Sequence, residues 1–229
     1  TSWNALMIRG LAVAGEALGE ARYIEAAARG ARFLLDHHRL ADGSLLRTSR
    51  PDAAPQAAEG SATPIAGFLD DYAFLAQALL ALHRATGDAH WRDEAARIVS
   101  VMREKFPDRE LGAFYFTAAD ATDLIVRQKT ATDSPLPSGN AVAAMTLLEL
   151  GELEAARRTI AVFAHPMEDQ GEGMSSMVQA AMMYLQKHEA FTVSAQGSGS
   201  AAERPVPPEQ LARAAVELWR EWSSATELR

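Results

Sequence analysis

Two consecutive aspartates, Asp70 and Asp71, are the side chains of this sequence best suited to acid–base chemistry. A carboxyl group can take up or deliver a proton at a reacting centre, and pairs of carboxyl groups hydrolyse glycosidic bonds. Neighbouring helical residues project about 100° apart, so these two cannot form such a pair with each other. A second catalytic carboxylate would have to come from elsewhere, for example from Asp123 or Asp133. We therefore predict Asp70 and Asp71 as catalytic candidates.

A structural role is the alternative for both aspartates. Asp70, placed just before a helix, is a good N-cap, and Asp71 in the first helical turn would complement the helix dipole. Both interpretations stay open at the level of the sequence.

Aromatic and amide side chains recur at the starts of apolar helical runs, and we predict that they bind substrate. A Trp or Tyr ring can stack on the apolar face of a pyranose, and an Asn side chain can both donate to and accept from hydroxyl groups. This mixture favours a sugar-like ligand. For Ser138 an N-cap role is the alternative. The predicted set is Trp3, Asn4, Tyr72, Ser138 and Asn140.

Two cations, Arg127 and Lys129, belong to the segment 124–129, whose alternating pattern is typical of an extended chain. Alternation would place both cations on one face, where they could meet an anionic group of the ligand or an acidic rim. We include them among the substrate-binding candidates. Solvated surface charge is the alternative.

The composition excludes several classes of site. The absence of cysteine removes thiolate zinc sites, iron–sulfur clusters and Cys nucleophiles, and fits a reducing compartment, so we expect a cytoplasmic protein. The six histidines lack metal-ligand spacing, and no phosphate or dinucleotide motif occurs, so no metal or cofactor is expected. A net charge of −8 with dispersed basic residues argues against nucleic acid. No apolar run approaches the roughly 18 residues of a membrane span.

The elements that must position these residues form a repeat. Trp3-Asn4-Ala5, Asp71-Tyr72-Ala73 and Gly139-Asn140-Ala141 begin at positions 3, 71 and 139, a constant step of 68 residues. Each triplet opens an apolar helical run, and after the first two runs a Gly turn leads into a second helix. A helical hairpin repeated at a long period indicates stacked hairpins that bury a common core.

The pattern predicts an all-α fold, a partial (α/α)6 toroid with short β-hairpin pieces in its loops. In a toroid, the long loops that enter the inner helices rim a central cavity, so the candidate residues would converge there. The predicted helices are 2–18, 21–38, 70–86, 90–105, 138–150, 152–164 and 174–187, with extended pieces at 44–47, 111–117 and 191–193. The predicted domains are residues 1–194 as the C-terminal part of the toroid, 195–208 as a flexible linker, and 209–229 as a terminal amphipathic helix.

Several segments, in order, resemble a known family. They are 67–75, 112–117, 124–129 and 137–140, together with Trp3-Asn4. The chain resembles the spermatogenesis-associated protein 20 and YyaL family over residues 1–187. Members of this family join an N-terminal thioredoxin-like domain to an α/α toroid related to N-acylglucosamine 2-epimerases and six-hairpin glycosidases. The resemblance implies the fold and a C-terminal fragment, with the thioredoxin-bearing half as a possible partner.

Two functional hypotheses follow. In the first, the chain binds or processes a carbohydrate-like ligand at the inner-helix rim, with epimerase- or glycosidase-like acid–base chemistry if it is an enzyme. In the second, it is a non-catalytic scaffold that works with a thioredoxin-like domain or another protein. Because seven helices cannot close a ring of twelve, exposed apolar edges and self-association are also expected.

Overall fold

The computed structural model describes residues 1–49, 65–121 and 124–195, and its side chains as far as residue 188. These residues are mostly helical, which confirms the all-α class. They divide into two compact units, the first made of residues 1–109 and 114–130, the second of residues 110–113 and the chain from Ala131 onward. The predicted linker and terminal helix, together with Asp123, lie outside the described residues.

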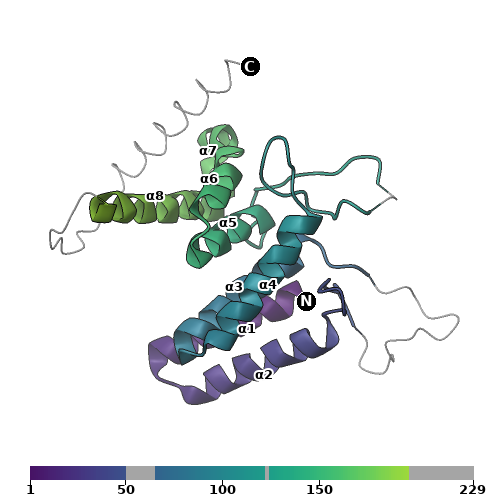
Figure 1. The fold of residues 1–229 in the computed structure, drawn as a ribbon, viewed down its shortest axis with the longest axis vertical. Helices are drawn as coiled ribbons and strands as arrows, with labels where there is room; N and C mark the ends of the chain where they lie inside the picture. Colours follow the sequence, from purple (N-terminus) through teal and green to yellow (C-terminus); the bar gives the residue numbers. More distant parts are fainter. Residues whose placement is uncertain (50–64, 122–123, 196–229) are drawn as a thin grey trace, which may run out of the picture. The chain divides into compact units, whose positions relative to one another are not determined.

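The first unit consists of two helical hairpins (Figure 1). The helices are α1 (Ser2–Leu18), α2 (Ala21–His37), α3 (Leu69–Thr86) and α4 (Ala89–Lys105). Gly19 and Gly87, one repeat step apart, end α1 and α3 in the left-handed conformation, with φ of 68° and 70°. Glycine adopts this conformation without the steric cost that a Cβ imposes. The sequence therefore predicted both helix ends.

α3 is the central helix of this unit. It packs against α1, α2 and α4, and every residue from Asp71 to Leu82 is buried. Its sequence is apolar on all sides over that stretch, as expected for a helix surrounded by others. Most charged side chains of α2 and α4 are exposed, but Glu94 of α4 is buried.

The connecting segments form isolated antiparallel bridges, and no strand occurs among the described residues. The bridges are Arg39 with Leu45, Leu46 with Ala66, and Pro107 with Phe114. The predicted β-hairpin pieces are therefore wrong as strands. In the segment 111–117, Gly112 and Ala113 both have positive φ, of 87° and 59°, which turns the chain before a ladder can extend.

The second unit contains α5 (Gly139–Leu150), α6 (Leu153–Ala161), α7 (Ala164–Gln170), a 3₁₀ turn η1 (Gly171–Met174) and α8 (Ser175–Ala195). α5 packs against α6 and α8, and α6 also contacts α8. Gly151 ends α5 with a φ of 88°, as Gly19 and Gly87 end α1 and α3 in the first unit.

Two sequence predictions fail in this unit. The helix predicted over 152–164 ends at Ala161, and Pro166 lies in the first turn of α7, where a missing N–H costs nothing. The strand predicted at 191–193 is helical, because α8 continues to Ala195. A Phe-Thr-Val run is only a weak strand signal, and no Gly or Pro separates it from the preceding helix. None of the helices in the described part of the chain is long and apolar enough to cross a membrane.

Candidate ligand site at the first turns of α1 and α3

Asp71 is a buried carboxylate that ties two helices together. Its Oδ1 accepts a hydrogen bond of 2.8 Å from the backbone N–H of Ser2, at the start of α1. Its Oδ2 accepts from the backbone N–H of Phe68 at 2.9 Å, which closes a capping box on α3, and from Arg47 Nη1 at 3.3 Å. The side chain is 0% exposed. Asp71 therefore has a structural role at the start of α3, and through Ser2 it also fixes the start of α1.

Asp70 lies beside Asp71 but in a different environment. The helix begins at Leu69 with Phe68 as its N-cap, so the predicted N-cap role of Asp70 is wrong. Its side chain is half-buried, and no hydrogen bond or ion pair joins it to another described residue. Its pKa is raised to about 6, chiefly by burial and also by the charge of Asp71, while Arg47 opposes both. A carboxyl group with this pKa can exchange a proton near neutral pH.

Trp3 and Asn4 occupy the first turn of α1. Because Asp71 bonds to Ser2, this turn lies against the first turn of α3. The side chain of Trp3 is 76% exposed, and Asn4 is exposed as well. An aromatic face and an amide are thus accessible on the turn that adjoins the one bearing Asp70.

Tyr72 belongs to the core. Its side chain is 1% exposed, its hydroxyl oxygen accepts from the backbone N–H of Leu45 at 2.8 Å, and its ring packs edge-on against Phe106. Burial raises the pKa of the phenol. In this arrangement the ring anchors the loop after α2 and offers no face to a ligand.

Arg127 and Lys129 lie on one face of their segment, as predicted, and both face the ring of Tyr115. The Arg127 guanidinium carbon is 4.1 Å from the ring centroid, and its Nε and Nη2 donate to the carbonyl of Thr117 at 3.1 and 2.6 Å. Lys129 Nζ donates to Asp108 Oδ2 at 2.8 Å, and so does the Tyr115 hydroxyl at 3.0 Å. These contacts hold the loop after α4, and a ligand role for either cation stays a prediction.

Ser138 and Asn140 belong to the second unit, at the start of α5. The Ser138 side chain caps this helix by accepting from the backbone N–H of Ala141 at 3.2 Å, which is the alternative considered for it. Asn140, in the first turn, is fully buried. Whether these residues share a rim with Asp70 and Trp3 stays a prediction.

Asp133, considered as a second catalytic carboxylate, joins helix ends as Asp71 does. Its Oδ1 accepts from the backbone N–H of Ser138 at 2.9 Å. Its Oδ2 accepts from Ser175 Oγ at 3.0 Å and from the backbone N–H of Ser176 at 2.8 Å. One carboxylate thus serves the starts of both α5 and α8.

Over 151 residues, 65% of the chain, the sequence is 38% identical to spermatogenesis-associated protein 20 of rat and 37% identical to the human protein. Over that stretch the chain is a homologue of spermatogenesis-associated protein 20. This confirms the resemblance. The aligned stretch spans about a fifth of the length of these curated relatives, 19% in each case. No family model matches the chain.

Sequence analysis did not identify two residues that lie close to the buried carboxylate of Asp71. Arg47 pairs with Asp71, and its guanidinium lies 4.9 Å from the ring centroid of Phe68. The His38 ring nitrogens lie 2.7 Å from the hydroxyl oxygens of Thr1 and Ser49, and burial lowers its pKa. Both depend on the loop after α2 folding back onto α1 and α3, which local patterns do not reveal.

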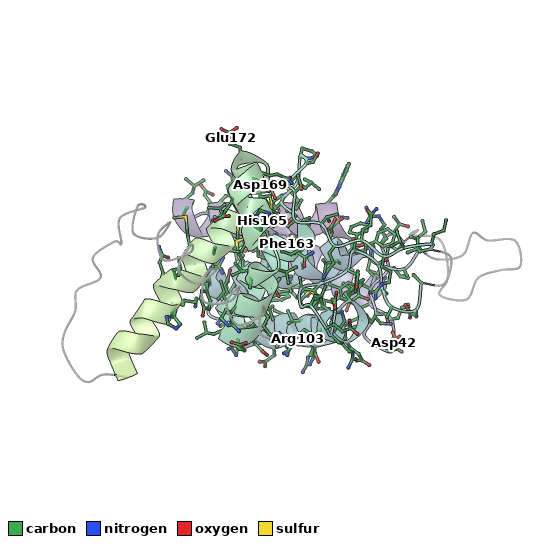
Figure 2. The ribbon with its side chains drawn as sticks, turned by 90° about the horizontal axis from the view of Figure 1, so that it is seen from above. Asp42, Arg103, Phe163, His165, Asp169 and Glu172 are labelled. Atoms are coloured by element: carbon green, nitrogen blue, oxygen red, sulfur yellow. The ribbon has the colours of Figure 1, made fainter. Side chains whose placement is uncertain are left out.

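Each unit has a further polar feature. A pocket of about 430 Å³ opens between α2 and the start of α4, beside Thr86 at the opposite end of α3 from Asp70. In the second unit, the ring nitrogens of the exposed His165 on α7 lie 3.8 Å from Asp169 Oδ2 and 3.9 Å from Glu168 Oε2. Figure 2 labels His165 and Asp169. Within the described ranges, no group of side chains meets the requirements of a metal site.

Proposed function

We propose that this chain is part of an α/α toroid that binds or processes a carbohydrate-like ligand at the rim formed by the first turns of its inner helices. The 68-residue step and the pairing of inner helices α1 and α3 with outer helices α2 and α4 support the toroid. In this arrangement the loops that enter the inner helices surround the ligand.

The observation that carries the proposal is the contrast between the two aspartates. Asp71 has its oxygens saturated by backbone and guanidinium donors, while Asp70 is half-buried, unbonded within the described residues, and has a pKa of about 6. A carboxyl group in this state, beside the turn that bears the exposed Trp3, is suited to proton exchange with a bound hydroxyl or carbon acid.

The proposed roles follow from the chemistry of each group. Trp3 stacks on the apolar face of a sugar ring, Asn4 exchanges hydrogen bonds with hydroxyls, and Asp70 transfers the proton. Asp71 and Arg47 position the two turns. A glycosidase mechanism requires a second carboxylate, and an epimerase must remove a proton from one face of a carbon and return one to the other face, so in either reaction Asp70 would be one of two acid–base groups.

The test compares Asp70→Asn with the unchanged chain against a panel of neutral and N-acylated sugars. The substitution keeps the shape of the side chain but removes proton transfer, so binding should persist while any turnover falls by about 10²–10⁴-fold. Trp3→Ala should weaken binding, and Asp36→Asn, on the exposed face of α2, should change neither. If no sugar in the panel binds, the proposal is wrong.

A second candidate function is the non-catalytic scaffold, working with a thioredoxin-like domain or another protein. It is favoured by the exposed apolar side chains of α1, among them Met7 and Leu18. Recovery of a thioredoxin-like protein by the chain, with no sugar bound, would support it.

A further inference from the structure

A buried histidine at the end of α2 joins two hydroxyl groups. His38 is the C-cap of α2, and it is only 5% exposed. Its Nδ1 lies 2.7 Å from Thr1 Oγ1, and its Nε2 lies 2.7 Å from Ser49 Oγ. We call these three residues the His38 cluster. The ligand site proposed around Asp70 makes no use of it.

The loop after α2 brings the cluster together by folding back on itself. The Leu46 N–H donates to the carbonyl of His38 at 2.7 Å, and the Leu40 N–H donates to the carbonyl of Ser44 at 2.8 Å. These backbone bonds close the turn, and the chain that leaves it returns to the end of the helix. Ser49 therefore meets His38 although they are 11 positions apart in the sequence.

The direction of the hydrogen bonds follows from the hydroxyl group of Thr1, which has a single proton. Thr1 Oγ1 donates this proton to the carbonyl oxygen of Leu46. Toward His38 it can therefore only accept, so Nδ1 of His38 carries the ring proton. Burial lowers the pKa of His38, which keeps the ring neutral at neutral pH and leaves a lone pair on Nε2. Ser49 thus donates its hydroxyl proton to Nε2.

This arrangement is the one that activates a serine hydroxyl as a nucleophile. It requires a hydroxyl directed at a neutral imidazole and a third group that orients the imidazole through its other nitrogen. Ser49 is half-buried, so its side chain is not enclosed by the fold. The negative charge of Asp71 favours the protonated form of His38, the form that would appear once Ser49 gave up its proton.

We propose that Ser49 is a nucleophile that accepts a short acyl group from an activated ester, with His38 as its general base. Ser49 Oγ forms a bond to the carbonyl carbon, the bond from this carbon to the leaving oxygen breaks, and the proton of Ser49 passes through His38 Nε2 to the leaving group. Water, deprotonated by the same imidazole, then releases the carboxylic acid and restores Ser49. Thr1 is a positioning residue, because it fixes the tautomer of the ring. The reaction and its reacting groups differ from those assigned to Asp70, so either proposal can fail alone.

The test incubates the whole chain with p-nitrophenyl acetate and locates the acetyl group by peptide mass spectrometry. Ser49 should be acetylated at least about tenfold faster than Ser100, an exposed serine of α4 without a base described beside it. His38→Gln should slow the acetylation of Ser49 by about 10²-fold or more. The control is His37→Gln, which alters the exposed neighbouring histidine and should leave the rate unchanged.

Two variants of Thr1 separate activation of Ser49 from a purely structural role of the cluster. Thr1→Val removes the acceptor for Nδ1 and should slow the acetylation of Ser49 by about tenfold or more, while Thr1→Ser keeps the hydroxyl and should restore the rate. A urea titration shows which variants are folded, and this pair decides the matter if His38→Gln is not. Acetylation of Ser49 no faster than that of Ser100 would overturn the proposal. An unchanged rate in folded His38→Gln or in Thr1→Val would overturn it as well.

Discussion

At the scale of single residues, the adjacent side chains of Asp70 and Asp71 have different chemical states because their surroundings differ. Asp71 is enclosed by the N–H groups of Ser2 and Phe68 and by Arg47, which makes it part of the scaffold. The side chain of Asp70 is half-buried and has no hydrogen-bond or ion-pair partner among the described residues, and its burial raises its pKa. One residue of displacement along the helix thus separates a saturated, positioning carboxylate from one whose raised pKa suits the proposed proton transfer.

Replacing Asp71 should affect both stability and its neighbour. In Asp71→Asn, one carboxylate oxygen becomes an amide nitrogen, so a buried donor loses its acceptor, and unfolding free energy should fall by about 1–3 kcal/mol. Loss of the negative charge also removes one cause of the raised pKa of Asp70, which should move below about 6. A urea titration and a carboxyl NMR titration measure these effects. An unchanged urea midpoint would contradict the tether.

The raised pKa of Asp70 predicts a pH dependence of stability. Between its ordinary value of 3.8 and the folded value of about 6, the folded state binds more protons than the unfolded state. Stability should therefore fall as pH rises through this window, and the cost should be complete above it. Asp70→Asn should relieve this cost by on the order of 1–3 kcal/mol above pH ~6 and by little below pH ~4. Denaturant melts of the two proteins between pH ~4 and pH ~7, with Asp36→Asn as control, measure this difference. An equal difference in unfolding free energy at every pH would contradict the raised pKa of Asp70.

At the scale of elements, three helices end before a glycine at the positions predicted from the sequence. Gly19, Gly87 and Gly151 are local signals, since a left-handed C-cap needs only the residue that adopts it. The tether through Asp71 could not be predicted in the same way, because Ser2 is 69 residues away and only packing of α1 on α3 brings them together. The prediction of a strand at 191–193 was wrong because the strand propensity of three residues is weaker than the continuation of the helix that precedes them.

Two glycine substitutions should have opposite effects. Gly87→Ala forces a Cβ into a φ of 70°, which should cost about 1 kcal/mol of unfolding free energy. Gly10→Ala, inside α1 with open space around the added Cβ, should stabilise by about 0.5–1 kcal/mol. Thermal melts of both variants test this, and two shifts of the same sign would argue against the helix ends described.

At the scale of the whole molecule, the exposed apolar side chains of α1, among them Met7 and Leu18, predict self-association of the chain. This apolar surface is available to other copies, so sedimentation should show concentration-dependent association. A double substitution, Met7→Glu with Leu18→Glu, should reduce it without lowering stability, because both side chains are exposed. Leu40→Glu should leave it unchanged. A monomer at all concentrations would contradict this expectation.

The account depends most on Asp70 as the acid–base group of a sugar site. The most direct measurement is the pH profile of turnover, on whichever sugar of the panel binds, for the unchanged chain and for Asp70→Asn. The account predicts an apparent pKa near 6 in the unchanged chain, the value of Asp70 in its buried position beside Asp71 and Arg47, and the loss of this pKa in the variant with sugar binding retained. Turnover with the same profile in both proteins would contradict the account, as would a panel from which no sugar binds.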